Sequence, residues 1–484
     1  MTGSEGFTKR IIQAFAWEGS TKLGIQIASW LSTIFVARTL MPEDYGVVAI
    51  SGLFTGVLTL ITEFGLGAGI VTRREINEEQ YNRCFWLGMA ASVVLYMVLF
   101  AAAPLIAAAY HTPLLRDIMR IAALGLIIAA VRIVPLSQVL RTLDYRFRSL
   151  TEMFGQFVQA GATVLLAVNG YGAWSLVIGY LVAQSITTFI FVLRATGISW
   201  PAFSLHGLRD LIDFGVKITG ARLLGFFVSN CDQIIISGLL GTRYSGLYSV
   251  SANLATAPLD KIGAIFNRVA FPILARLQES PETARKLFLK FHFYLLLVAS
   301  PLLVGLGVVA REAVTILLSS KWAAAFQVLQ ILCFANVIRL SGMVLPTILE
   351  GLGMAGAVFR YQLLSAAVMP LGFLAGSHWG LRGVTSAWLV AFPIVYLWLL
   401  RKTLSVLGIR IAVFLDSIKP VLAANVLMAG GVLAARLAIT SFGPGERLAA
   451  LVAVGASVYA VTLAAFLPRS AWSEMRGILN GLRK

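Results

Sequence analysis

The chain has 484 residues, of which 58% are hydrophobic and only 13% charged, and its formal net charge is +17. Soluble proteins carry about 25% charged residues, so this composition and the mean hydropathy of +0.84 exclude an ordinary soluble enzyme. Because the basic residues are scattered along the chain, they do not indicate nucleic-acid binding. The composition predicts a membrane protein, which leaves transporters, channels and membrane-embedded enzymes.

Hydrophobic stretches recur along the whole chain and are separated by short polar breaks. Each is close to the length of about 20 residues that a helix needs to cross a bilayer, and helices satisfy their own backbone hydrogen bonds in lipid. In chain order, the fourteen predicted spans are 11–37, 46–71, 84–109, 118–140, 150–168, 172–193, 212–240, 244–274, 291–310, 322–347, 354–377, 383–400, 418–436 and 448–467. The stretch 314–318 is too short to span and is expected at the membrane interface. The predicted fold class is an all-α polytopic membrane protein with about fourteen transmembrane helices.

The distribution of lysine and arginine between the loops predicts the orientation. If the N-terminus is cytoplasmic, the inner segments hold most of these residues. The outer loops then hold only Arg38, Arg116, Arg243, Arg311, Lys321, Arg382, Arg436 and Arg447. Because cytoplasmic loops are enriched in basic residues, we expect both termini in the cytoplasm of a bacterial inner-membrane protein.

A stretch near the N-terminus, FVARTLMPEDYGVVAIS at residues 35–51, resembles IISGLLGTRYSGLYSVS at residues 235–251. The offset is 200 residues, and each copy joins the end of one span to the start of the next. Six spans separate the copies, so both point the same way, and parallel repeats predict two six-helix lobes with the substrate between them. The expected domains are an N-terminal lobe over 1–200, a C-terminal lobe over 201–400, and two additional helices with a basic cytoplasmic tail over 401–484.

Charged residues within the predicted spans are candidates for function, because charge inside a membrane is costly unless it is paired or hydrated. The basic candidates for substrate binding are Lys22, Arg132, Lys217, Arg222, Lys261, Arg268 and Arg339. The acidic candidates for ion coupling, by carrying protons or ligating sodium, are Glu18, Glu63, Asp213, Asp232 and Asp260. A cavity with this cationic excess suits a phosphate or pyrophosphate, since arginine can bind two phosphate oxygens. The alternatives are side chains that reach the membrane surface from helix ends and structural ion pairs.

The sequence offers no catalytic residues, metal ligands or cofactor site. It contains neither a GxxxxGK[ST] nucleotide loop nor an HExxH metal motif. The four histidines, His111, His206, His292 and His378, are expected in loops or at span edges. A membrane acyltransferase is expected to have a buried histidine, and a polysaccharide polymerase a large external loop with arginine and histidine. The sequence indicates neither of these enzymes, and protons or sodium ions are the expected coupling ions.

Several motifs carry a resemblance to a known family. They are ARTLMPEDYG at Ala37–Gly46, EFGLGAGIV at Glu63–Val71, LRTLDYRFRSLTE at Leu140–Glu152 and VAFPILARLQ at Val269–Gln278, with Trp17 and Gly19 in the first span. With these motifs, the chain resembles the Wzx-like, polysaccharide-export branch of the flippase superfamily that includes the MATE exporters. The resemblance covers the whole chain in span number and the part up to Gln278 in motif.

The resemblance implies a MATE-like flippase fold and a transporter rather than an enzyme. The implied substrate is an undecaprenyl-pyrophosphate-linked oligosaccharide repeat unit, which crosses the inner membrane by ion-coupled alternating access for O-antigen, capsule or exopolysaccharide export. The implied partners are this lipid-linked substrate, membrane lipids, and a polysaccharide polymerase with its chain-length machinery. The alternatives are a MATE-type multidrug or cation antiporter, against which the basic excess and the two extra spans argue, and a membrane-embedded polysaccharide polymerase.

Overall fold

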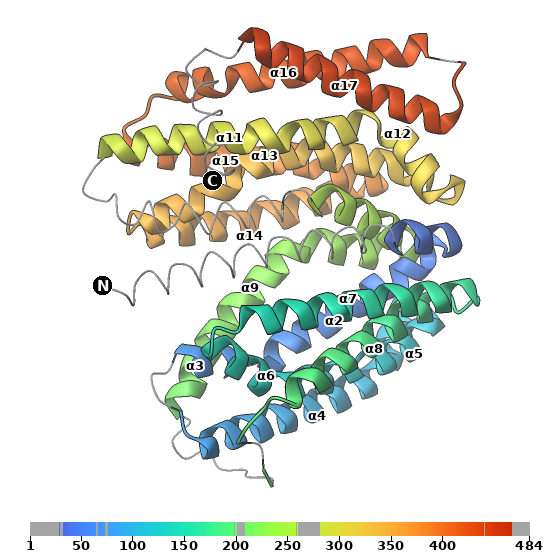
Figure 1. Ribbon diagram of the computed structural model, residues 1–484, viewed down its shortest axis with the longest axis vertical. Coiled ribbons are helices and arrows are strands. Elements are labelled where there is room, and N and C mark those ends of the chain that lie inside the picture. Colours follow the sequence, from blue (N-terminus) through green and yellow to red (C-terminus); the bar gives the residue numbers. More distant parts are fainter. Residues whose placement is uncertain are drawn as a thin grey trace. The chain divides into compact units, whose positions relative to one another are not determined.

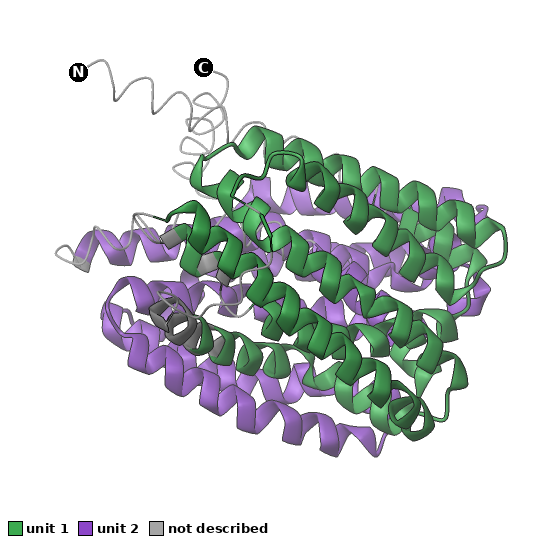
Figure 2. Cartoon of the chain, turned by 90° about the horizontal axis from the view of Figure 1, so that it is seen from below, with its two compact units in different colours: residues 1–246 green, residues 247–484 purple. Residues whose placement is uncertain are grey.

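A computed structural model describes residues 29, 32–63, 66–72, 76–197, 199–200, 209–257, 259, 281–439 and 441–466. Every regular element within these ranges is a helix, and short turns join them (Figure 1). The chain forms two compact units, residues 1–246 and residues 247–484 (Figure 2). We call them unit 1 and unit 2.

Unit 1 begins, in its described part, with a helical segment over 32–39. Its further helices are α2 (Pro42–Glu63), α3 (Leu66–Thr72), α4 (Glu78–Ala109), α5 (Pro113–Ala122), α6 (Leu124–Arg141), α7 (Tyr145–Val168), α8 (Ala173–Val192) and α9 (Arg209–Leu240). Helix α7 packs along α8, α4 packs against α5 and α6, and α9 packs against α2 and α3. Leu99, Ile118 and Met119 lie in a buried hydrophobic cluster to which α2, α4, α5, α6 and α8 contribute.

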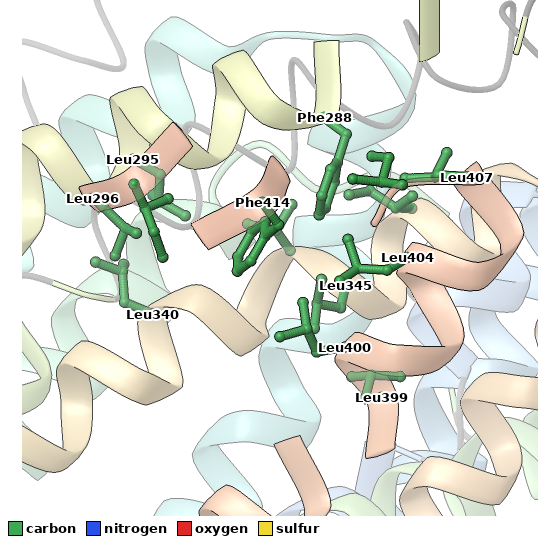
Figure 3. Packing of buried hydrophobic residues seen from close by; sticks show 14 of the residues in the cluster. Phe288, Leu295, Leu296, Leu340, Leu345, Leu399, Leu400, Leu404, Leu407 and Phe414 are labelled. Carbon is green, nitrogen blue, oxygen red and sulfur yellow. The ribbon is translucent and has the colours of Figure 1, made fainter. Parts of the chain in front are cut away.

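A helical segment over 242–257 continues from unit 1 into unit 2. Unit 2 then contains α11 (Pro281–Val308), α12 (Ala310–Ala313), the short helices η1 (Val314–Leu318) and η2 (Ser320–Trp322), α13 (Ala325–Gly351), α14 (Ala355–Ser377), α15 (Gly380–Leu407), α16 (Ile411–Ala438) and α17 (Pro444–Phe466). Helices α11, α13, α15 and α16 enclose the main core, in which Phe288 stacks on Phe414 and leucines from α13 and α15 fill the remaining space (Figure 3).

Local sequence explains several helix ends. Asn77 caps α4 by accepting a hydrogen bond from the backbone N–H of Gln80, whose side chain accepts one from the N–H of Asn77 in return. Helix α5 starts at Pro113, a residue that is favoured at the first helical position because it has no N–H to satisfy. Helix α15 ends at Leu407 and is followed by Gly408, whose φ of 63° is the left-handed conformation that favours glycine.

The predicted spans agree with the structure in order and within several residues in position. Eleven helical segments in the described ranges are long and apolar enough to cross a membrane. The three other predicted spans are 11–37, which lies largely outside the described residues, 244–274, of which the part up to residue 257 is helical, and 150–168, which corresponds to α7. The span predicted at 118–140 consists of α5 and α6, which meet at Ala123. The chain is an all-helical polytopic membrane protein, as the sequence predicted.

The units do not follow the domain boundaries that the repeat suggests at residues 200 and 400. Helix α9, which the repeat assigns to the C-terminal lobe, packs against α2 and α3 and belongs to unit 1. Compact packing and evolutionary repetition are different criteria, because a helix can belong to one repeat and pack against another. The repeat-based boundaries therefore stay a prediction.

The two copies of the repeated turn contact each other through backbone. A methyl group added to Gly46 would lie 1.8 Å from the carbonyl oxygen of Thr242, and one added to Gly246 would lie 1.8 Å from that of Pro42. The 200-residue offset relates Gly46 to Gly246 and Pro42 to Thr242, so it maps one contact onto the other and the contact is reciprocal. Glycine allows backbones to approach this closely, and the local symmetry supports the repeat.

We expect Gly46→Ala to destabilise the protein, because the new methyl group must push α2 away from the 242–257 segment. Overpacking of this kind costs about 1–3 kcal/mol, which should appear as a lower melting temperature of the purified protein in detergent. Gly52→Ala is the matched control, because Gly52 lies on the same helix and a methyl group there would have no neighbour within 4 Å. Equal melting temperatures for the two variants would contradict the close approach.

Candidate functional site

The structure describes five of the twelve predicted site residues in full. Glu18, Lys22, Asp260, Lys261 and Arg268 lie outside the described residues. Asp213 and Lys217 lie on α9, but their side chains are not described. The five that can be placed are Glu63, Arg132, Arg222, Asp232 and Arg339. They occupy separate positions on their helices, and only Glu63 and Arg222 form a pair with each other.

Glu63 and Arg222 join the end of α2 to α9. Nη1 of Arg222 lies 3.2 Å from Oε2 of Glu63, and both side chains are more than two-fifths exposed. The two side chains therefore form an ion pair, which is the structural alternative to a substrate contact. A substrate anion would have to compete with Glu63 for Arg222.

Arg132 has a different environment, on the face where α6 packs against α8. Its guanidinium donates a short hydrogen bond to Oε1 of Gln184, and Nε2 of Gln184 donates to the hydroxyl of Tyr180 at 2.8 Å. No carboxylate pairs with Arg132 among the residues that the structure describes. The amide orients the guanidinium without neutralising it, so Arg132 keeps a positive charge that an anion can use.

A small hydrophilic cavity of about 100 Å³ lies elsewhere in unit 1, between the 32–39 segment, α2, α7 and α8. Hydroxyl and amide groups dominate its lining, among them those of Ser32, Thr33, Gln156, Gln159 and Thr163. It has room for about three water molecules, each of which occupies about 30 Å³ in the liquid. Such a lining suits water or the hydroxyl groups of a neutral ligand, because it offers both donors and acceptors.

Asp232 is a buried carboxylate on α9, with only 6% of its surface exposed. Its Oδ1 accepts a hydrogen bond of 2.7 Å from the backbone N–H of Gln233. The side chain of Gln233 donates to Oγ of Ser245 at 2.6 Å, and the hydroxyls of Ser237 and Ser245 are 3.0 Å apart. Gln233, Ser237 and Ser245 thus form a polar cluster that joins α9 to the second copy of the repeated turn, and Asp232 precedes Gln233 on α9.

In unit 2, Arg339 extends from α13 across the face of an aromatic ring. Its Cζ lies 4.2 Å from the ring centre of Trp388 on α15, and its Nη1 donates to Oδ1 of Asn336 at 3.0 Å. Trp388 is itself held by a hydrogen bond of 3.1 Å from its Nε1 to the hydroxyl of Tyr248. These contacts orient the guanidinium, and within the described part of unit 2 no carboxylate balances its charge.

The structure corrects the expectation for His292, which lies inside α11 rather than in a loop or at a span edge. The side chain is fully buried, and its Nε2 lies 2.7 Å from Oγ of Ser341, which in turn lies 2.7 Å from the hydroxyl of Tyr396. Phe288 and Phe414 cover the ring at 5.1 Å. Basic residues just before His292 hid the start of the helix, so the sequence placed the span too late.

The buried histidine also changes the argument against an acyltransferase. The sequence indicated no buried histidine, and that premise was wrong. His292 is fully enclosed by side chains of unit 2, however, and a catalytic histidine must come within hydrogen-bond reach of its substrate. Its contacts with Ser341 and Tyr396 link α11, α13 and α15 instead.

Comparisons with known proteins agree with this picture of a transporter. The family model described as "Polysaccharide biosynthesis protein" matches residues 35–327, more than half of the chain. The chain is 26% identical over 472 residues to the teichuronic acid biosynthesis protein TuaB of Bacillus subtilis, with 96% of this chain and 97% of TuaB covered. It is 25% identical over 466 residues to the succinoglycan biosynthesis transport protein ExoT of Rhizobium meliloti, with 94% and 93% covered.

Two solved structures show the same fold. One is the lipid II flippase MurJ in an inward closed conformation, with a TM-score of 0.73, 13% identity, and coverage of 93% of this chain and 98% of MurJ. The other is an inward-facing MATE multidrug transporter, with a TM-score of 0.61, 16% identity, and coverage of 79% and 95%. The family match, the full-length relatives and the shared fold lead to one conclusion: this chain belongs to the polysaccharide biosynthesis protein family and has the fold that MurJ and the MATE transporter share.

Proposed function

We propose that the protein moves an undecaprenyl-pyrophosphate-linked oligosaccharide repeat unit from the inner to the outer leaflet of a bacterial inner membrane, for polysaccharide export. The names of the two relatives support a polysaccharide precursor as the substrate, because they refer to teichuronic acid and succinoglycan. Both termini lie in the cytoplasm in this proposal. A polysaccharide polymerase and chain-length machinery are the proposed partners.

The main support for the proposal is that, in the described ranges, no carboxylate neutralises the positive charge of Arg132 or Arg339. Each lies on a membrane-spanning helix, each is half-buried, and each is oriented by neutral groups rather than by a carboxylate in the described ranges. A cationic drug would be repelled at such positions. A pyrophosphate is attracted, since each arginine can donate two parallel hydrogen bonds to its oxygens.

An ion gradient is the energy source that we propose, because the sequence has no Walker-type nucleotide loop. Asp232 is the best-described candidate for coupling, as a buried carboxylate on α9. It can accept a proton or contribute an oxygen ligand to sodium. The two lobes of the repeat, 1–200 and 201–400, are the proposed moving parts, and alternating access follows from their rearrangement around the substrate.

The proposal predicts the phenotype of a deletion strain. Without the transporter, pyrophosphate-linked oligosaccharide should accumulate in the lipid extract and surface polysaccharide should disappear, and the intact gene should reverse both changes. Mass spectrometry of the extracted lipids and an immunoassay of the polymer measure the two effects. Unchanged lipids together with new sensitivity to cationic drugs would instead support the MATE-type antiporter.

Arg132→Ala and Arg339→Ala should each lower polysaccharide export about 10-fold or more, because a hydrogen bond to a charged group contributes about 1.5–3 kcal/mol. Membrane levels of the protein, measured by immunoblot, should stay unchanged. Arg120→Ala is the matched control for Arg339→Ala, because Arg120 on α5 also lies 4.2 Å from an aromatic ring, that of Phe100, and its hydrogen bond to the carbonyl of Phe100 is exposed. If Arg120→Ala lowered export as much as Arg339→Ala, the loss would reflect arginine–aromatic packing and not substrate binding.

Exchange of the charges between Glu63 and Arg222 separates a structural pair from a substrate contact. Arg222→Glu alone should reduce export, because it places two carboxylates side by side. The double variant Glu63→Arg with Arg222→Glu rebuilds the ion pair in reverse and should restore export if the pair is structural. Export that stays lost in the double variant, at normal protein levels, would assign Arg222 to the substrate site.

A further inference from the structure

A second basic site lies at one end of unit 2, where α12 packs against α17 and η1 follows α12 (Figure 1). A cavity of about 380 Å³ opens there, and its lining includes Arg311, Glu312, Thr315, Arg436, Phe442 and Arg447. All of these residues belong to unit 2, and none is among the predicted site residues. The volume is at the small end of the range that ligand sites occupy, about 300–1,000 Å³.

The cavity has more positive than negative charge. Arg436 donates to Oε2 of Glu312 at 2.8 Å and to the carbonyl of Val308, so the pair closes one side of the cavity. Arg447 donates to the carbonyl oxygen of Arg436 at 3.2 Å, and Cζ of Arg311 lies 5.9 Å from the ring centre of Phe326. One of the three arginines is therefore neutralised by a lining carboxylate, and two positive charges remain.

Two of the arginines also have donors that need an acceptor. Nε of Arg436 and Nε of Arg447 are buried and make no hydrogen bond within the described residues. Buried donors in proteins almost always have a partner, so an unfilled pair on one cavity points to a ligand with oxygen acceptors. Helix α17 begins at Pro444 on the same cavity, and the N-terminus of a helix attracts anions through its dipole.

The position of the cavity indicates where the anion comes from. It lies at the ends of three membrane-spanning helices: α11 ends at Val308, α16 ends at Ala438 and α17 begins at Pro444. Helix ends lie at the level of lipid headgroups. Phe442 and Leu437, which flank the arginines in the chain, are 52% and 81% exposed and offer an apolar surface beside the charges. Basic pockets between transmembrane helices are known to bind the headgroups of anionic lipids, and this cavity offers the same charge with apolar surface beside it.

We propose that this cavity binds the phosphate group of an anionic membrane lipid, a phosphodiester such as that of phosphatidylglycerol. The arginines donate to the phosphate oxygens, and the exposed apolar side chains contact the acyl chains. In the orientation proposed above, the lipid belongs to the outer leaflet. The lipid site does not depend on which substrate the protein transports.

The test uses the full-length protein purified in detergent and its melting temperature as mixed micelles of phosphatidylglycerol are added. Phosphatidylglycerol should raise the melting temperature, whereas phosphatidylcholine, which has no net charge, should not. The double variant Arg311→Gln with Arg447→Gln should weaken the apparent affinity about tenfold, the expected effect of losing charge-assisted hydrogen bonds. Arg436 stays unchanged in this variant because its pair with Glu312 holds α16 to α12.

Arg382→Gln is the matched control, because Arg382 is an exposed arginine of unit 2, also in a predicted outer loop, and does not line the cavity. It should respond to phosphatidylglycerol as the unmodified protein does. Equal weakening by Arg382→Gln would overturn the proposal, since it would reduce the effect to general surface charge. So would an equal rise in melting temperature with phosphatidylcholine.

Inorganic phosphate at millimolar concentration distinguishes the two sources of the anion. Phosphate alone should leave the melting temperature unchanged, because it lacks the acyl chains that contact the apolar surface. If phosphate alone stabilised the protein as much as the lipid does, the site would bind the free ion and the lipid assignment would be wrong.

Discussion

Hydrocarbon offers no hydrogen-bond partner, and this constraint governs every polar group of the membrane-spanning chain. For the backbone it dictates helices, in which each N–H finds a carbonyl of the same segment. In helix α2, polar side chains are satisfied within the same helix. The hydroxyls of Thr55, Thr59 and Thr62 each donate to the carbonyl four residues earlier, at 2.8 to 3.0 Å. Such residues make a helix more polar without requiring a partner from another element.

For charged side chains the same constraint separates two kinds of position. Where a carboxylate lies within reach, as Glu312 does for Arg436, the charge is neutralised and the pair ties two helices together. Where the partners are an amide or an aromatic ring, as at Arg132 and Arg339, the guanidinium is oriented but remains cationic. Evolution has little structural reason to keep an arginine of the second kind inside a membrane, which is why these two positions locate the proposed substrate contacts.

The fold alone does not identify Arg132 and Arg339 as candidates for substrate binding. MurJ and a MATE transporter share the architecture at 13% and 16% identity, and the helix packing can be retained while the side chains facing inward change. The feature that is tied to the architecture is the backbone contact at Gly46 and Gly246, where two equivalent turns approach so closely that no side chain fits. The polar residues therefore indicate the function, whereas small residues such as Gly46 and Gly246 allow the helices to pack in this fold.

The sequence by itself determined the fold class, the order of the spans and most of their positions, because hydrophobicity over twenty residues is a local property. It misplaced the start of α11, since Arg285, Lys286 and Lys290 near the first turns resembled a loop, and with it the burial of His292. Charged residues inside the spans could be named as candidates for the same local reason. The family motifs could be recognised from the sequence as well.

Only the tertiary structure decided which charges are paired. The partners Glu63 and Arg222 are 159 residues apart, Glu312 and Arg436 are 124 apart, and Arg132 and Gln184 are 52 apart. No pattern along the chain encodes such distances, because they depend on how helices pack and rotate against one another. The basic cavity between α12, α16 and α17 could not be predicted for the same reason: its arginines come from three helices that only folding brings together.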